Sequence, residues 1–363
     1  MLNRREFLKS ASSGLIFCRC SMASGARETQ SRTSTRIPLI AGRKPLTVDV
    51  HGHCFIRDDW PLIRDRPEAR ELERIMAAPY FPELIGVENR ITEMDRMGID
   101  VQALSLYVGQ YHYWAEPALA EKLVRIQNEK LAELCATYPN RLVGLGAVSL
   151  HLPDLAARQM AHAVDAYDFR GFMITGSVGD EQISAPRFEP FWKQAEELET
   201  LIFVHPRGFG AGDIRFEGHG WLSNTIGNPL ETTLALSHLI FSGFLDRFPR
   251  LRICAAHGGG YLPSYVGRSD NCYAVDPRCQ HMSRKPSEYL SQMYFDTLVY
   301  SNQNLRYLID QVGVDRIVMG TDYPFPVASR DPLDDVLSVP GLDDAAKEAI
   351  FGATAARLLK LRS

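Results

Sequence analysis

The sequence lacks both an apolar run of membrane-spanning length and a surplus of charge of one sign. Among its 363 residues, 40 Lys and Arg stand against 44 Asp and Glu, so the formal net charge is −4. A transmembrane helix needs about 20 consecutive apolar residues, so an integral membrane protein is excluded. Nucleic-acid-binding proteins normally carry a basic surplus, which is missing here. The composition, 45% apolar and 23% charged, is that of a soluble enzyme with one large or two ordinary domains.

Cysteine is scarce as well. Of the seven cysteines, Cys18 and Cys20 lie in the first 26 residues, and no C-x-x-C pair occurs anywhere. A disulfide-dense scaffold is therefore excluded. A disulfide between Cys272 and Cys279 stays open, because sequence alone does not decide connectivity.

The N-terminal segment has the features of an export signal. Asn3–Lys9 reads NRREFLK, a weakly apolar stretch follows, and the small residues Ser24–Ala26 offer a cleavage site. This arrangement resembles a twin-arginine signal. We therefore expect a signal segment over residues 1–26, a flexible linker over 27–44, and one folded domain over 45–363 in the periplasm. The alternative is the basic N-terminus of a cytoplasmic protein.

Short apolar runs alternate with amphipathic segments over the rest of the chain. Continuous apolar runs are typical of strands buried on both faces, and the segments between them have helical periodicity. Eight repeats predict an α/β fold, a (β/α)8 TIM barrel, with Phe55–Arg90 as an insertion after strand 1 over the barrel mouth. The alternative is an open doubly wound sheet, but no glycine fingerprint for a dinucleotide follows the first strand. The expected strands are Pro45–Val50, Val101–Leu106, Leu142–Val148, Gly171–Ile174, Leu201–Val204, Leu251–Ala256, Gln292–Val299 and Arg316–Gly320.

Four histidines and one aspartate come directly after expected strands. His51 and His53 follow the first strand, His205 the fifth, His257 the sixth and Asp322 the eighth. In a barrel, these strand ends meet at one mouth. Residues two apart in an extended chain point the same way, so His51 and His53 can bind one cation together. With His205 and Asp322 they form a set that suits one divalent ion, zinc or, as the alternative, manganese.

Four motifs carry a resemblance to a known family. The chain resembles the amidohydrolase-2 family over roughly residues 46–358, nearly all of the expected folded domain. Within that family it is most similar to the aminocarboxymuconate-semialdehyde decarboxylases. The motifs are Val48–His53, Phe203–Pro206, Ala256–Gly260 and Gly320–Pro326.

The resemblance implies roles for individual residues. The histidines at positions 51, 53 and 205, together with Asp322, match the metal ligands of the family. His257 matches the histidine that acts on metal-bound water. Arg268 matches an arginine that crosses a dimer interface and holds a substrate carboxylate in the neighbouring subunit. A homodimer is therefore expected, because each site would be incomplete alone.

The resemblance supports the metal ligands of this chain better than it supports the substrate-binding residues. The decarboxylases have tryptophan after the His-Pro motif, where this chain has Arg207, and their substrate-binding arginine after strand 1 has no match here. Arg207 and Arg268 are the candidates for binding a substrate carboxylate, because a guanidinium presents a planar bidentate fork. Trp114 and Phe325 are candidate walls of the substrate pocket.

The expected function is that of a metal-dependent carboxy-lyase (decarboxylase) acting on a small unsaturated or aromatic carboxylic acid. His257 and Asp322 are the expected proton carriers. The same residues suit a metal-dependent hydrolase of a lactone, ester or amide, which is the alternative. A binding protein that kept the barrel but lost its activity is a third hypothesis, and the complete ligand set argues against it. No nucleic-acid partner is expected.

Overall fold

The computed structural model describes residues 38–40, 42–210 and 215–361. The expected signal segment and most of the expected linker lie outside these residues. Within them, no helix combines the length and apolar character needed to cross a membrane. The five cysteines in these ranges are free thiols, including Cys272 and Cys279.

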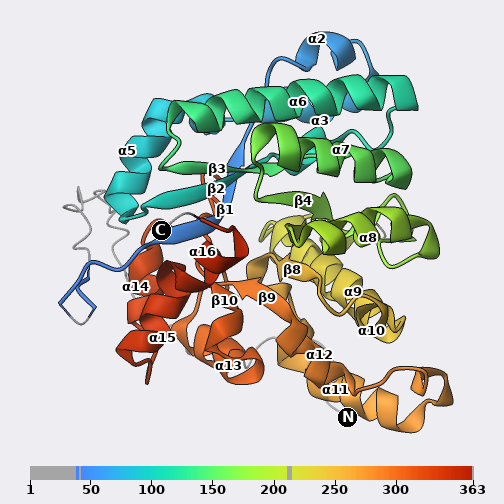
Figure 1. Cartoon of the computed structure of the whole chain (residues 1–363), viewed down its shortest axis with the longest axis vertical. Helices are drawn as coiled ribbons and strands as arrows, with labels where there is room; N and C mark the ends of the chain where they lie inside the picture. The colour runs from blue at the N-terminus through green and yellow to red at the C-terminus, as the bar shows by residue number, and fades with distance from the viewer. Residues whose placement is uncertain (1–37, 41, 211–214, 362–363) are drawn as a thin grey trace, which may run out of the picture. The chain divides into compact units, whose positions relative to one another are not determined.

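Eight parallel strands form the centre of the fold (Figure 1). Each strand pairs with the next along the chain, in the order β1-β2-β3-β4-β7-β8-β9-β10. The ring closes between β1 and the segment after β10, where the backbone nitrogen of Asp322 donates to His51 O and that of His53 donates to Tyr323 O, both at 2.8 Å. The predicted (β/α)8 barrel is confirmed. Its strands are β1 (Val48–Cys54), β2 (Val101–Leu106), β3 (Leu142–Gly146), β4 (Gly171–Thr175), β7 (Leu201–His205), β8 (Arg252–Ala255), β9 (Met293–Asp296) and β10 (Ile317–Val318).

Strand β1 extends further than the sequence predicts. Its expected end was Val50, but pairing with β2 continues to Cys54, which lies opposite Leu106. The polar residues at the end of the apolar run are kept extended because β2 holds them on one side and the segment after β10 on the other. His51 and His53 are therefore part of the strand itself.

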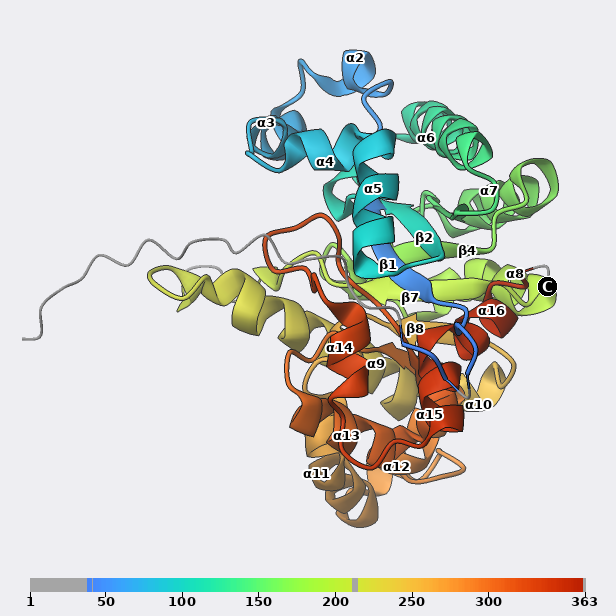
Figure 2. The ribbon, with the colours of Figure 1, turned by 90° about the vertical axis from the view of Figure 1, so that its left-hand side faces the viewer.

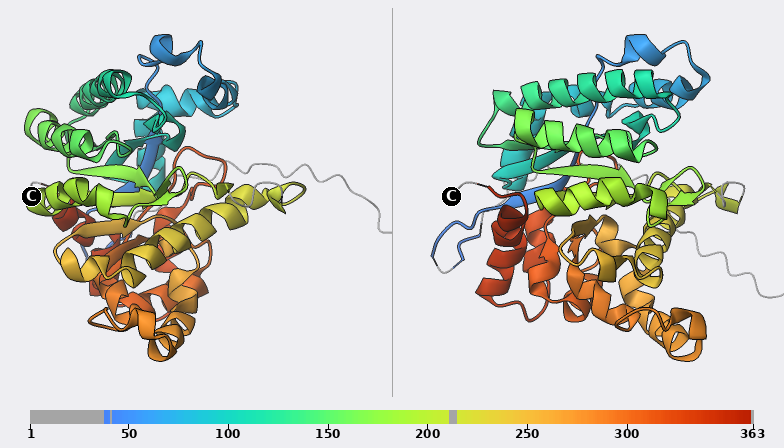
Figure 3. Two further views of the ribbon diagram at one scale, coloured as in Figure 1. Left: turned by 90° about the vertical axis from the view of Figure 1, so that its right-hand side faces the viewer. Right: turned by 45° about the vertical axis from the view of Figure 1, so that its right-hand side comes forward.

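Helices cover the outside of the strands, and the views in Figure 3 show them on opposite sides of the barrel. Strands β4 and β7 are consequently buried at every residue, as expected for strands covered on both faces. A small antiparallel pair, β5 (Ser177–Val178) and β6 (Glu181–Gln182), follows β4. The helices outside the insertion are α5 (Val87–Met97), α6 (Pro117–Thr137), α7 (Pro153–Tyr167), α8 (Glu189–Leu198), α9 (Asn228–Phe241), α10 (Phe244–Arg247), α11 (Leu262–Val275), α12 (Pro286–Tyr289), α13 (Asn302–Val312), α14 (Pro332–Leu337), α15 (Asp344–Glu348) and α16 (Thr354–Leu358).

The insertion after β1 folds into three short helices, α2 (Trp60–Ile63), α3 (Arg70–Met76) and α4 (Phe81–Ile85). Figure 2 shows them together at the top of the view, beside α5 and α6. They have a small hydrophobic core of their own, in which Leu72 and Phe81 pack with Leu123 of α6. This packing holds α3 at the carboxyl end of the barrel strands, where it reaches the site described below.

Candidate active site

Five polar side chains from four barrel strands meet at the carboxyl end of the barrel. The Nε2 atoms of His51 and His53 are 3.1 Å apart. Asp322 Oδ1 lies 3.4 Å from His51 Nε2 and 3.0 Å from His53 Nε2. The ring centroids of His205 and His51 are 4.9 Å apart, and His257 Nε2 lies 3.5 Å from Asp322 Oδ2. Each of the five residues named from the sequence is therefore in this cluster.

The cluster has the properties of a single metal site. Ligand atoms of His51, His205, His257 and Asp322 all lie within 4.8 Å of one another. Among the described residues, His205 Nε2 and Asp322 Oδ1 are buried and have no hydrogen-bond partner. Buried polar atoms are rarely left unpaired, and a cation would satisfy both. Nitrogen and carboxylate donors without sulfur suit one divalent ion, so the residues present fit the expected group.

Asp296, at the end of β9, belongs to the site although it was not predicted from the sequence. His51 Nδ1 donates to Asp296 Oδ2 at 2.8 Å, which leaves His51 Nε2 free to face the cluster. The backbone nitrogens of His257 and Gly258 also donate to this carboxylate, at 3.0 and 2.9 Å. Such a partner fixes the tautomer and orientation of a metal-binding histidine. The available signal was a lone aspartate at the end of an apolar strand, on the same edge as the histidines.

Two other histidines are oriented by carbonyl groups. His205 Nδ1 donates to Pro206 O at 2.7 Å, and His53 Nδ1 lies 3.4 Å from Leu106 O. In both rings Nε2 is the nitrogen directed at the cluster. The backbones of His257 and Asp322 have φ angles of 54° and 62°, in the left-handed region that non-glycine residues seldom adopt. Strained backbone of this kind is concentrated at functional sites.

The electrostatics of the cluster favour the ligand protonation state at His205 and Asp322, and the protonated state at His51. Burial, with the neighbouring imidazoles, lowers the pKa of His205 well below its ordinary value. Burial would raise the pKa of Asp322, but the imidazoles of His51, His257 and His53 outweigh it and hold that pKa well below the ordinary value. Burial would lower the pKa of His51, but the carboxylates of Asp322 and Asp296 outweigh it and raise that pKa. Metal ligands must be deprotonated, and an ionised Asp322 beside a neutral His205 meets this requirement.

A buried polar network holds β1 in place beneath the cluster. Asp49 accepts hydrogen bonds from Thr321 Oγ1 at 2.6 Å and from Gln102 Nε2 at 2.7 Å. Arg90 of α5 donates to Gln102 Oε1 at 2.8 Å and to the carbonyl of His53. The network thus ties β1 and β2 to the segment that carries Asp322. No local pattern in the sequence indicates these roles, because they depend on which residues meet across strands.

The cluster of five side chains opens into a cavity of about 260 Å³. Phe325, a predicted wall residue, lines it, and the ring centroids of Phe325 and His53 are 5.2 Å apart. Arg207, predicted to bind a carboxylate, also lines the cavity, where Arg207 Nη2 donates to Glu71 Oε2 at 2.7 Å. Glu71 belongs to α3, so the insertion supplies part of the cavity wall.

The remaining two predicted substrate-binding residues, Trp114 and Arg268, lie elsewhere in the chain. Trp114 packs against the hydrophobic core of the insertion, with the guanidinium of Arg66 5.3 Å from its ring centroid. Of the described residues that line the cavity, none is Trp114 or Arg268. Arg268 is exposed on α11.

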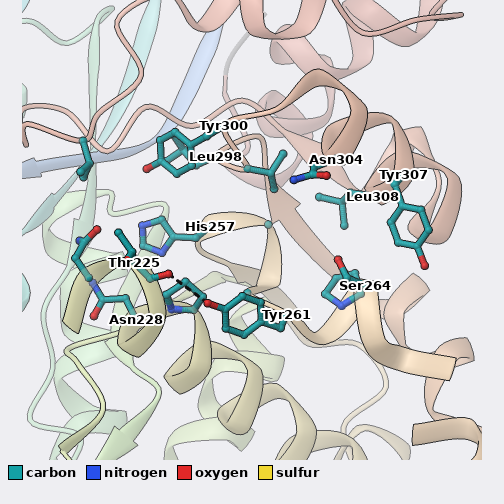
Figure 4. A pocket seen from close by; sticks show the side chains of 17 residues that line it. Thr225, Asn228, His257, Tyr261, Ser264, Leu298, Tyr300, Asn304, Tyr307 and Leu308 are labelled. Atoms are coloured by element: carbon teal, nitrogen blue, oxygen red, sulfur yellow. Dashed lines mark hydrogen bonds between the residues drawn. The ribbon is translucent and has the colours of Figure 1, made fainter. Parts of the chain in front are cut away.

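A second cavity, of about 530 Å³, adjoins the first. His257, Asn224, Asn228 and Val327 line both cavities, so His257 stands where they meet. Figure 4 shows Tyr300 and Tyr261 on either side of His257, and the helix that begins at Leu262 and carries Arg268 contributes Ser264 to the wall.

Comparison with known proteins agrees with this geometry. The amidohydrolase family model, Amidohydro_2, matches residues 48–361. The chain belongs to the amidohydrolase family. The family resemblance predicted from the motifs is confirmed.

Similar proteins share a reaction type. The 2-amino-3-carboxymuconate-6-semialdehyde decarboxylase of Dictyostelium discoideum is 27% identical over 88% of this chain and 92% of its own. The 5-carboxyvanillate decarboxylase of Sphingomonas paucimobilis is 26% identical, with a TM-score of 0.79 over 87% of this chain and 99% of its own. A dihydroxybenzoic acid decarboxylase from Polaromonas sp. JS666, solved with manganese and the inhibitor 2-nitroresorcinol, is 25% identical, with a TM-score of 0.74 over 88% and 98%. These similarities indicate a carboxy-lyase of the amidohydrolase superfamily.

Proposed function

We propose that the protein is a metal-dependent decarboxylase of a small aromatic carboxylic acid. The observation that carries the proposal is the pair of buried, unpartnered ligand atoms, His205 Nε2 and Asp322 Oδ1, in a cluster that opens into a cavity. The similar decarboxylases support the reaction type, and two of the three act on aromatic acids by their names. The substrate of this chain is thus expected among hydroxylated benzoic acids.

His51, His53, His205 and Asp322 would hold one divalent ion. His53 belongs to this set because its Nε2 lies within 3.1 Å of both His51 Nε2 and Asp322 Oδ1. His257 is kept for proton transfer: its side chain lines both cavities and can meet a substrate there. Zinc is the ion expected from the sequence, but the manganese in the Polaromonas enzyme makes manganese the first to test. Both ions accept nitrogen and oxygen donors.

The reaction needs a proton at the ring carbon that bears the carboxylate. A bound divalent ion would supply Lewis-acid stabilisation of the negative charge on the substrate. His257 donates the proton to the ring carbon, the bond between this carbon and the carboxylate breaks, and its electron pair returns to the ring as CO2 leaves. Asp322 stands beside this imidazole, with its Oδ2 3.5 Å from His257 Nε2, and helps to position the ring for the transfer. Phe325 offers an apolar surface to the ring, and exclusion of water by this surface favours proton transfer within the site.

We also propose a homodimer in which Arg268 completes the site of the partner subunit. Arg268 is exposed on α11, and no ion pair or hydrogen bond of its side chain occurs among the described residues. An exposed guanidinium without a local partner is free to bind a carboxylate in a neighbouring subunit.

Purified protein, loaded with manganese, tests the reaction type. CO2 release is measured with a panel of hydroxybenzoic acids, and ring opening or ester cleavage with a matched panel of lactones and esters. We expect CO2 release that is abolished by a chelator and restored by metal. Hydrolysis without CO2 release would instead establish the hydrolase alternative, and a chain that binds no metal would contradict the proposal altogether.

A further inference from the structure

The cavity beside the cluster of histidines and Asp322 contains a charged pair, Glu71 and Arg207, that has no role in the proposed metal chemistry. Glu71 of α3 accepts from Arg207 Nη2 at 2.7 Å through Oε2 and from the Tyr107 hydroxyl at 3.1 Å through Oε1. All three side chains line the same cavity as His53 and Asp322. Burial raises the pKa of Tyr107, and the carboxylate of Glu71 raises it further, so the hydroxyl keeps its proton and remains a donor.

The protein keeps space for this carboxylate. A Cβ atom at Gly109 would lie 2.9 Å from Glu71 Oε1 and 2.5 Å from Cε1 of Tyr107. Any other residue at position 109 would therefore displace the side chains of Glu71 and Tyr107. Glu71 itself comes from the insertion, whose own hydrophobic core fixes α3 through Leu72.

The ring of Phe325 lies between His53 of the cluster and Tyr107, which contacts Glu71. Its ring centroid lies 5.2 Å from that of His53 and 5.9 Å from that of Tyr107. An aromatic acid whose carboxylate lies at the cluster and whose ring lies along Phe325 would thus direct its far edge toward Tyr107 and Glu71. The chemistry of this end of the cavity determines which ring substituents it accepts.

Arg207 does not offer a free cation there. Its charge is offset by Glu71, so a second substrate carboxylate would have to compete with Glu71 for the guanidinium and would be repelled by it. A carboxylate only accepts hydrogen bonds, and each Glu71 oxygen has lone-pair capacity beyond its one partner. This end of the cavity therefore suits a substituent that donates a hydrogen bond.

We propose that Glu71 selects aromatic acids that carry a hydrogen-bond donor, a hydroxyl or an amino group, on the ring edge far from the reacting carboxylate. The proposal deepens the proposed function and rests on it for the placement of the reacting carboxylate. It makes Glu71 a specificity-determining residue, and Arg207 and Tyr107 its positioning residues.

Three acids that differ only at ring position 4 test the proposal. They are 2,4-dihydroxybenzoate, 2-hydroxy-4-methoxybenzoate, which cannot donate there, and 2-hydroxyterephthalate, which carries a second carboxylate. We expect kcat/KM for the dihydroxy acid to exceed that for the methoxy acid by at least about tenfold, because the methoxy group would displace water from the half-exposed carboxylate of Glu71 without offering it a hydrogen bond. In Glu71→Ala this ratio should fall to about one, and kcat/KM for 2-hydroxyterephthalate should rise about tenfold, because Arg207 is released for a charge-assisted bond.

Two further variants separate selection from structure. Glu71→Gln keeps an acceptor oxygen and should retain part of the preference for the hydroxyl group. Glu73→Gln changes an exposed glutamate of the same helix and should leave both ratios as in the wild type. An equal loss of kcat/KM for all three acids in Glu71→Ala would make the pair merely structural and would overturn the proposal.

Equilibrium binding tests selection without turnover. Calorimetric titration of the manganese-loaded protein compares resorcinol with 3-methoxyphenol, the phenols that decarboxylation of the first two acids would release. Resorcinol should bind at least about tenfold more tightly to the wild type, and the two should bind alike to Glu71→Ala. If this difference is found while no acid releases CO2, the proposed function has failed and the selection stands. Equal binding to the wild type, or no binding of either, would overturn the selection.

Discussion

Asp296 and His51 join two strands of the barrel that are far apart in the sequence. Asp296 Oδ2 accepts the Nδ1 proton of His51 at 2.8 Å, and both side chains are fully buried. Gly320 leaves room for this contact, since a Cβ atom there would lie 2.9 Å from Cβ of Asp296 and 3.0 Å from Cβ of His51. The same carboxylate binds the backbone nitrogen of His257, so one side chain positions two histidines of the cluster.

Asp296→Asn should weaken metal binding, because an amide orients the His51 ring poorly and adds no charge. Loss of such an outer partner costs about 10- to 100-fold in metal affinity. Competition with a chromophoric chelator measures the effect. Asp165→Asn, an exposed residue of α7, is the matched control and should bind metal like the wild type. An unchanged affinity in Asp296→Asn would show that His51 is held by the strand alone.

His257→Ala should retain the metal and lose turnover. A general acid or base contributes about 10²- to 10⁴-fold to rate, and the proposed ligands are all still present in this variant. Metal content by elemental analysis and CO2 release are measured on the same sample. If the variant purifies without metal and does not take it up, His257 is a ligand, and His53 becomes the candidate for proton transfer.

Arg268→Ala should be inactive alone and should recover activity when mixed with His51→Ala. Only a mixed dimer contains a site with intact ligands from one subunit and Arg268 from the other. Refolding the two variants together and measuring CO2 release checks this. Lack of recovery in a sample that contains mixed dimers would exclude a shared site.

Arg90→Ala should destabilise the fold. Arg90 is almost fully buried, donates to Gln102 and to the carbonyl of His53, and lies with its guanidinium 4.9 Å from the ring centroid of Tyr323. Removing it leaves buried acceptors unpaired, and we expect the free energy of unfolding to fall by about 3–5 kcal/mol. Denaturant titration measures this change. Arg96→Ala, which breaks the partly exposed pair with Glu93 on the same helix, should change it by less than about 1 kcal/mol.

Export through a twin-arginine signal predicts that Arg4→Lys together with Arg5→Lys retains the protein in the cytoplasm. Cell fractionation with an antibody against the folded domain measures the distribution. Mutation of Arg19→Lys, outside the arginine pair, is the control. Equal periplasmic amounts of the double variant and the wild type would contradict twin-arginine export, and a cytoplasmic wild type would establish the alternative location.

The periodicity of the chain was sufficient to predict the barrel. All eight predicted strands occur, because apolar runs of four to eight residues between helical segments are too short for buried helices and are typical of buried strands. The end of β1 could not be predicted, since His51 and His53 are held extended by partners from β2 and from the segment after β10. Local composition carries no information about such partners.

The sequence by itself determined the barrel and the five residues of the cluster, because the carboxyl ends of parallel strands must meet at one mouth and polar residues there stand out against apolar runs. Only the tertiary structure decided that Asp296 orients His51, that Trp114 packs in the insertion, and that Glu71 neutralises Arg207. The contacts of Asp296 with His51 and of Glu71 with Arg207 join residues 245 and 136 positions apart. Trp114 lies in an irregular loop, and the geometry of all three depends on packing that no local pattern encodes.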